Sequence, residues 1–247
     1  MIRLRVVFLI LMGISSGKAG EYFHFDAPLG PGERTGTLHG YRFNQKTETL
    51  RVIDRNATQL APWKTLGEAF ASSRALAGCN GGFTLADGKP VGIVISDSVR
   101  FGALETKPGS SSGLVVVKWN SISLLSSAQT TEADLIGATQ AIQGGPFLVE
   151  KGKSVAGLDT KSFSRRTVLL TSGTGDWAIL YAPSATLSGL ASMLGDGKTF
   201  TKFPVATALN LDGGLSSGIW IHLGDGAPPV YLREVNQVRT GIAVTRT

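Results

Sequence analysis

The sequence ALNLDGGLSSGIWI, residues 208–221, joins two apolar runs through a short segment rich in glycine and serine. The first run ends on Asn210 and Asp212, which predicts a carboxylate at the end of a buried strand. Such a carboxylate costs free energy unless it is paired or hydrogen-bonded. Gly213 and Gly214 leave room beside it for backbone N–H groups or a ligand. Two interpretations stay open: Asp212 is functional, or it only shapes an Asp-Gly turn.

The same segment contains G-x-S-x-G, residues 214–218, the pattern that positions the nucleophile of many serine hydrolases. The pattern occurs twice more in this chain of 32 glycines, so it carries little information. A partner for Ser216 would have to be His222, which follows in the same expected strand, because the other two histidines come earlier. We therefore expect Ser216 to be a supporting hydroxyl.

Outside this segment, short runs rich in β-branched and aromatic residues predict strands at residues 38–44, 49–55, 91–96, 113–119, 121–127, 167–172, 177–182 and 241–246. Helical periodicity appears at residues 65–75, 131–138 and 185–197. Strands outnumber helices, and the helices do not alternate regularly with them. The pattern predicts a single α+β domain with a mixed or antiparallel sheet and a few interspersed helices.

Residues 1–19 have the features of a cleaved secretory signal: a basic start, an apolar run at residues 6–14, and small residues up to Ala19. The apolar run is far shorter than the roughly 20 residues that span a bilayer. We expect a periplasmic or secreted protein with no membrane contact after cleavage, whose functional domain is residues 20–247.

Three of the 24 Lys and Arg residues, and none of the 18 Asp and Glu residues, lie in that leader, so its removal lowers the formal charge from +6 to +3. No block of like charges remains, which argues against a nucleic-acid partner. Because Cys79 is the only cysteine, the chain cannot form an internal disulfide. The three scattered histidines lack metal-ligand spacing, so we expect no metal and no other cofactor.

Arg165 and Arg166 precede an apolar run, and strand alternation sends neighbouring side chains to opposite faces. One guanidinium can then face the Asp212 loop, where its planar fork suits a phosphate or carboxylate. The alternative is that both are surface cations.

Five short motifs occur in the order found in the phosphodiester glycosidase family, which this chain resembles. They are Asn80-Gly81-Gly82-Phe83, Pro90-Val91-Gly92, the G-P-F-L-V-E-K-G of residues 145–152, Arg166-Thr167, and the N-L-D-G-G-L-S-S of residues 210–217. Leu215 departs from the pattern, since many members carry a third glycine there. The resemblance implies hydrolysis of the bond between a sugar anomeric carbon and a phosphodiester, with release of the sugar and a phosphomonoester.

The resemblance also implies the site residues. Asp212 and Arg166 would be catalytic, and the substrate-binding residues would be Asn80, Gly81, Gly145, Asn210, Gly213, Gly214 and Ser216. Phosphate is already a good leaving group, so a cation such as Arg166 would assist its departure. Asp212 would stabilise an oxocarbenium-like state, act as a nucleophile or activate water. A second carboxylate stays open among Asp87, Glu105, Glu150 and Asp159.

The expected partner is a small or polymeric sugar phosphodiester. The main alternative is a non-catalytic protein of the same fold that binds a phosphosugar or carbohydrate, since a fold does not guarantee activity. A serine hydrolase is the third hypothesis. The sugar, the aglycone, the stereochemical outcome and the oligomeric state are not predicted.

Overall fold

The computed structural model describes residues 20–31, 35–57, 62–119, 121–197, 203–224 and 226–247. The secretory leader expected at residues 1–19 lies outside the described residues. Its prediction, and the domain boundary that depends on it, therefore stay untested.

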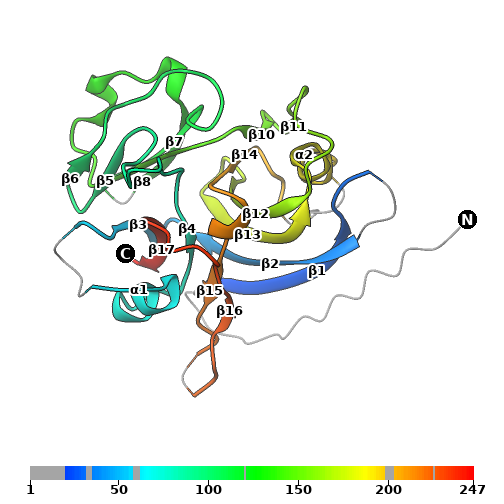
Figure 1. Ribbon diagram of the computed structural model, residues 1–247, viewed down its shortest axis with the longest axis horizontal. Helices are drawn as coiled ribbons and strands as arrows, with labels where there is room; N and C mark the ends of the chain where they lie inside the picture. The colour runs from blue at the N-terminus through cyan, green and yellow to red at the C-terminus, as the bar shows by residue number, and fades with distance from the viewer. Residues whose placement is uncertain (1–19, 32–34, 58–61, 120, 198–202, 225) are drawn as a thin grey trace, which may run out of the picture.

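The described residues fold into three sheets in which the neighbouring strands are antiparallel (Figure 1). The largest sheet has seven strands in the order β1-β2-β13-β12-β14-β10-β11. These are β1 (Glu21–Pro28), β2 (Thr35–Asn44), β13 (Asp176–Ala185), β12 (Ser164–Thr171), β14 (Thr207–Asn210), β10 (Phe147–Glu150) and β11 (Lys153–Ser154).

The other two sheets have five strands each. The second sheet runs β16 (Val230–Leu232), β15 (Ile219–Ile221), β4 (Ala77–Asn80), β17 (Thr240–Arg246) and β3 (Glu48–Asp54). The third sheet runs β6 (Val99–Phe101), β5 (Val94–Ser96), β9 (Gln140–Gly144), β7 (Gly113–Lys118) and β8 (Ser121–Ser126). It forms the upper left part of the molecule in Figure 1.

Two of the three predicted helices are present: α1 (Leu66–Ser72) and α2 (Leu187–Gly195), each capped by a threonine hydroxyl. The third prediction, residues 131–138, was wrong. That segment has a capping box but forms only the 3₁₀ turn Glu132–Leu135, because the backbone is extended at Ile136 and Gly137 takes a positive φ. A single turn forms too few hydrogen bonds to offset the free-energy cost of helix nucleation. Two more 3₁₀ turns are Ser127–Gln129 and Gly214–Ser216.

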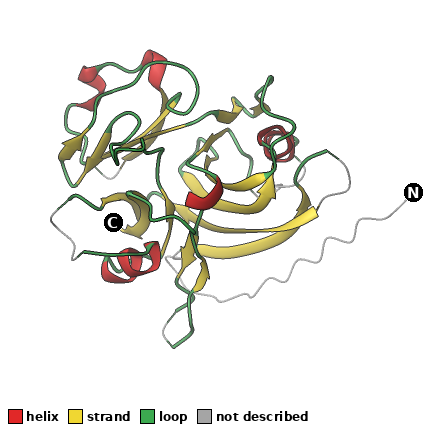
Figure 2. Ribbon diagram, in the orientation of Figure 1, coloured by secondary structure: helices red, strands yellow, loops and turns green. Residues whose placement is uncertain are grey.

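Strands dominate the described chain (Figure 2). The expected antiparallel arrangement is confirmed. The structure contains more strand and less helix than the predicted α+β class implies. All eight predicted strands overlap observed ones.

The largest apolar cluster contains residues from all three sheets, among them Leu169 of the first, Val52 of the second and Ile142 of the third. The opposite face of the seven-stranded sheet is covered by α2 through Leu190 and Leu194. Both faces of its central strands β12 and β14 are covered, so these strands offer polar groups to a ligand mainly at their ends.

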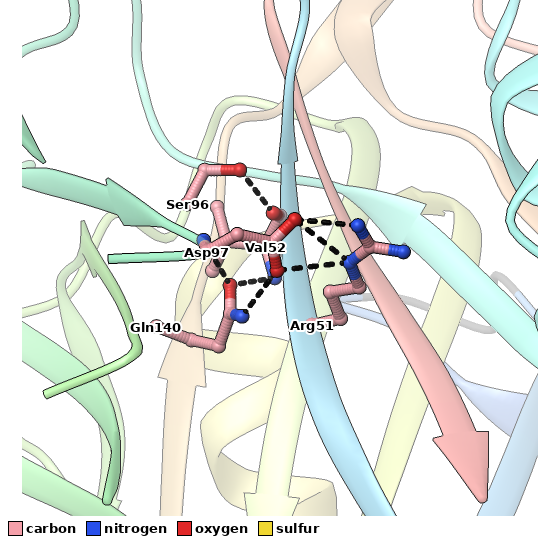
Figure 3. Close-up of polar contacts among 5 residues, drawn as sticks. All are labelled: Arg51, Val52, Ser96, Asp97 and Gln140. Carbon is pink, nitrogen blue, oxygen red and sulfur yellow. Dashed lines mark hydrogen bonds and ion pairs between the residues drawn. The ribbon is translucent and has the colours of Figure 1, made fainter. Parts of the chain in front are cut away.

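The buried side-chain amide of Gln140 links the third sheet to the second through hydrogen bonds (Figure 3). Gln140 of β9 accepts a hydrogen bond from the Val52 N–H of β3 at 3.0 Å and donates to the Asp97 carboxylate at 2.8 Å. That carboxylate also accepts from Arg51 Nε at 3.0 Å, and the Ser96 hydroxyl donates to the Val52 carbonyl at 2.7 Å. The cluster thereby bridges β3 to the third sheet.

We expect Gln140→Ala to lower the free energy of unfolding by about 2 kcal/mol, because it leaves the buried Val52 N–H without an acceptor. Urea denaturation followed by circular dichroism measures this loss. Gln237→Ala, at an exposed glutamine, is the matched control. Equal stability of the two variants would contradict this role of Gln140.

Candidate functional site

The sheet register brings Arg166 to the end of β14, beside the turn that holds Asp212. In the ladder between β12 and β14, Val168 pairs with Asn210, and the Leu211 N–H donates to the Thr167 carbonyl at 2.9 Å. β14 ends at Asn210, and the Asp212 N–H donates to the Gly81 carbonyl at 3.1 Å. The two predicted catalytic residues therefore lie on neighbouring segments at the same strand end.

The Asp212 carboxylate is partly buried and hydrogen-bonded within its own turn. The Gly213 N–H donates to Oδ1 at 2.8 Å, and the Ser216 side chain also hydrogen-bonds the carboxylate. Burial raises the pKa of Asp212 above its ordinary value, and these two hydrogen bonds oppose that rise without cancelling it. The carboxylate is thus less well solvated than a surface aspartate, which makes it a better base and nucleophile.

The Asn80 amide holds the backbone at Asp212. Its Nδ2 donates to the Asp212 carbonyl at 2.8 Å and to the Gly81 carbonyl at 3.3 Å. Its Oδ1 accepts from the Thr167 hydroxyl at 2.8 Å and from the Gly218 N–H at 3.2 Å. Asn80 is 1% exposed, so all four bonds of this amide are used inside the protein. Asn80 therefore positions the backbone of Asp212.

Arg166 keeps part of its guanidinium free. Nε donates to the Ala185 carbonyl at 3.3 Å and Nη2 to the Ser162 carbonyl at 3.1 Å. Within the described residues it forms no ion pair, although the charge of Asp159 favours its protonated form. Burial lowers the pKa of Arg166, but an arginine stays charged. Nη1 lies 3.2 Å from where a side chain at Gly213 would begin.

Arg165 turns to the other side of β12, as strand alternation predicts. Its Nε donates to the Tyr181 hydroxyl at 2.8 Å, and Nη2 donates to the Arg233 carbonyl. Of the two neighbouring arginines, Arg166 is therefore the one that faces the Gly213 loop.

The predicted glycines lie around the same strand end. Gly214 has φ +63°, a conformation that favours glycine, and it opens the turn that carries Ser216. A Cβ at Gly145 would overlap the Gly109 carbonyl oxygen, and one at Gly81 would overlap the Thr240 hydroxyl. The Asn210 Nδ2 reaches the Gly145 carbonyl at 2.8 Å. The structure thus brings the predicted site residues together from segments far apart in the chain.

The geometry gives no support to a Ser–His pair. Ser216 precedes β15 and faces Asp212, whereas His222 follows β15 and its backbone N–H donates to the Leu76 carbonyl. His24 and His39 pair with each other across β1 and β2, on the far side of β13 and β12 from β14.

Four residues were candidates for a second carboxylate: Asp87, Glu105, Glu150 and Asp159. Only Asp159 interacts electrostatically with Arg166. It is exposed, and its carboxylate accepts bonds from the backbone of residues 161 and 162. Among the described residues, no three His, Cys, Asp or Glu side chains gather where a metal ion could bind. None of their helices is long and apolar enough to cross a membrane.

Two buried supports were not singled out as site residues from the sequence. Thr167 donates to the amide oxygen of Asn80 and to the carbonyl of Asp212. Gln143, 1% exposed, donates to the Glu105 carbonyl at 2.7 Å and so holds the loop that precedes β7. The only signal for Gln143 is a polar residue within an otherwise apolar run.

The family model that matches this chain describes a class of glycosidases. The chain belongs to the phosphodiester glycosidase family, whose family model matches residues 73–245. A comparison with curated protein sequences gave no match.

Three solved structures share the fold. The catalytic domain of zebrafish N-acetylglucosamine-1-phosphodiester alpha-N-acetylglucosaminidase, auto-inhibited by its pro-peptide, is 16% identical with a TM-score of 0.67, over 95% of this chain and 86% of that one. A hypothetical protein from Synechocystis is 14% identical with a TM-score of 0.60, over 92% of this chain and 62% of that one. A Burkholderia pseudomallei protein thought to be exported is 12% identical with a TM-score of 0.56, over 85% and 74%.

The raised pKa of Asp212 predicts a pH-dependent gain in stability for Asp212→Asn. A carboxyl whose pKa is higher in the folded than in the unfolded state destabilises the fold once the pH exceeds both values. We expect the variant to be more stable than the wild type near neutral pH, with the difference vanishing as the pH falls below the unfolded-state pKa. Urea titrations between about pH 3 and about pH 8 test this sign. A variant less stable at neutral pH would contradict it.

We expect Asn80→Ala to cost about 3 kcal/mol of unfolding free energy, since the Gly218 N–H and the Thr167 hydroxyl lose their buried acceptor. Urea denaturation measures it. Asn56→Ala, at an exposed asparagine, serves as control. A loss no larger than that of the control would show that the amide is dispensable.

Proposed function

We propose that this protein hydrolyses the glycosidic bond between a sugar anomeric carbon and a phosphodiester. The observation that carries the proposal is that the partly buried Asp212 carboxylate and the Arg166 guanidinium both lie beside Gly213, and that Arg166 forms no ion pair among the described residues. Neighbouring opposite charges at such positions ordinarily pair with each other. A site that keeps both available suits a substrate with a cationic transition state and an anionic leaving group.

Arg166 would receive the departing phosphate. Its Nη1 lies beside Gly213, where the guanidinium can bind phosphate oxygens. Negative charge grows on the phosphate as the bond breaks, and preorganised donors stabilise that change. Little proton transfer to the leaving group is then required.

Asp212 would act on the sugar side. Its carboxylate can stabilise the developing oxocarbenium ion, attack the anomeric carbon or activate water. Its partial burial strengthens each of these roles, because low polarity increases electrostatic interaction. The substrate is small or polymeric, provided that its anomeric phosphate reaches the strand end. We further propose that the protein acts after export.

We expect Asp212→Asn to reduce kcat by at least about 100-fold while the substrate still binds, because the amide keeps the shape and loses the charge. Arg166→Ala should lower kcat/KM by at least about 100-fold, with Arg166→Lys restoring only part of it. The assay uses a sugar 1-(4-nitrophenyl phosphate) diester and a nucleotide-linked sugar. Arg100→Ala, at an exposed arginine on the third sheet, is the control.

Other outcomes would select the other hypotheses. Binding of these substrates without cleavage, with affinity lost in Arg166→Ala, would identify a binding protein on a glycosidase fold. Cleavage abolished by Ser216→Ala but kept in Asp212→Asn would identify a serine hydrolase.

A further inference from the structure

A cavity of about 330 Å³ lies at the end of the seven-stranded sheet that is remote from Asp212. β12 begins near the Asp212 turn, where it carries Arg166, and ends at Thr171, which lines the cavity. Five residues of an extended strand span roughly 17 Å, so the cavity is separate from the candidate active site. Its opposite wall is β8, the edge strand of the third sheet. The cavity is thus formed where the first and third sheets meet.

Every side chain that lines the cavity among the described residues is uncharged. The apolar part of its wall comes from β8 and β13: Ile122, Leu124, Leu125 and Trp177. The polar part carries amide and hydroxyl groups: Gln45, Ser123, Thr171 and Thr207. Since a charged group loses hydration in such surroundings without gaining a charged partner, a neutral ligand is favoured.

Three of the polar side chains keep hydrogen-bonding capacity for a ligand. Among the described residues, the half-buried hydroxyls of Ser123 and Thr207 form no hydrogen bond. The Trp177 indole N–H donates to Gln45 Oε1 at 3.2 Å. Because an indole N–H can only donate, this contact fixes the orientation of the amide and leaves its Nε2 as the donor. The cavity therefore offers one oriented donor and two hydroxyls that donate or accept.

The volume and the chemistry of the cavity select the ligand. Small-molecule sites have volumes of about 300–1,000 Å³ and combine apolar walls with a few polar groups that fix orientation. At about 330 Å³, this cavity has room for one small molecule. A sugar ring is uncharged, carries hydroxyl groups around its rim and exposes C–H groups on its faces. These properties match a wall of amide and hydroxyl groups beside leucine side chains.

We propose that this cavity binds one neutral sugar unit, at a second site remote from Asp212. The apolar wall contacts the C–H groups of the ring. Gln45 Nε2 and the hydroxyls of Ser123 and Thr207 form hydrogen bonds with the hydroxyl groups of the ring. The site retains a saccharide on the protein whether or not a bond is cleaved elsewhere, so the inference does not depend on the proposed function.

Nuclear magnetic resonance titration with neutral methyl glycosides tests the site. The reporter is the indole N–H signal of Trp177, one of four tryptophans, which Trp177→Phe assigns by its disappearance. Methyl glycosides of glucose, galactose, mannose and N-acetylglucosamine are the probes. We expect at least one of them to shift this signal in a saturable way, with a Kd on the order of 1 mM.

Variants of the wall show whether the sugar occupies the cavity. Thr207→Val keeps the β-branched shape and removes one hydroxyl, so Kd should rise about fivefold. Ser123→Leu fills the space and should abolish binding. The matched controls are Thr245→Val, at a half-buried threonine of β17, and Ser121→Leu, at an exposed serine of β8. Both should bind like the wild type, and so should Asp212→Asn.

Several outcomes would overturn the second site. One is that no neutral glycoside shifts the Trp177 signal at about 50 mM. Another is unchanged affinity in Thr207→Val, which tests the site even where Ser123→Leu does not fold. Tighter binding of a sugar phosphate than of the neutral sugar would contradict the ligand class, and loss of binding in Asp212→Asn would place the sugar at the candidate active site. None of these measurements uses cleavage, so failure of the proposed function is distinguishable from failure of this site.

Discussion

The buried amide of Asn80 is the interaction on which the site depends. It sits in β4 of the second sheet, yet its partners lie in β12, in the turn after β14 and just before β15. A side chain that satisfies four groups from separate segments can hold them only when all are in place. The amide therefore fixes where the seven-stranded sheet meets the second sheet, and Asp212 stands at that junction.

This arrangement resolves a conflict between folding and chemistry. A partly buried carboxylate and an arginine without a carboxylate partner both weaken the fold, because each gives up hydration without forming an ion pair. The backbone around them compensates through hydrogen bonds to the Asp212 carbonyl and N–H, which involve no charged side chain. The stability of the turn is thus supplied by neutral contacts, and the charges remain available to a substrate.

Sequence reasoning recovered the parts of the fold that local patterns encode. β-branched runs such as residues 113–119 and 177–182 became β7 and β13, and the periodicity of residues 185–197 became α2. β4 and β9 were not among the eight predicted strands, because A-G-C-N and Q-A-I-Q-G contain few β-branched residues, and their burial depends on neighbours such as Phe70 against Gly78. Alternation predicted that the two arginine side chains point to opposite faces, but only the folded structure shows that Arg166 is the one beside Gly213. The roles of Thr167 and Gln143 arise from contacts between distant segments, which no local pattern contains.

The long sequence separations within the site have a consequence for how activity appears during folding. Asn80 meets Asp212 across 132 residues, Gly218 across 138 and Thr167 across 87. Contacts between residues so far apart in the sequence form late, because the entropy lost in closing a long loop must first be offset by other contacts. A partly folded chain would therefore hold Asn80, Asp212 and Thr167 apart. The site is assembled only when the whole fold is complete, so a refolding chain would acquire it in the final step.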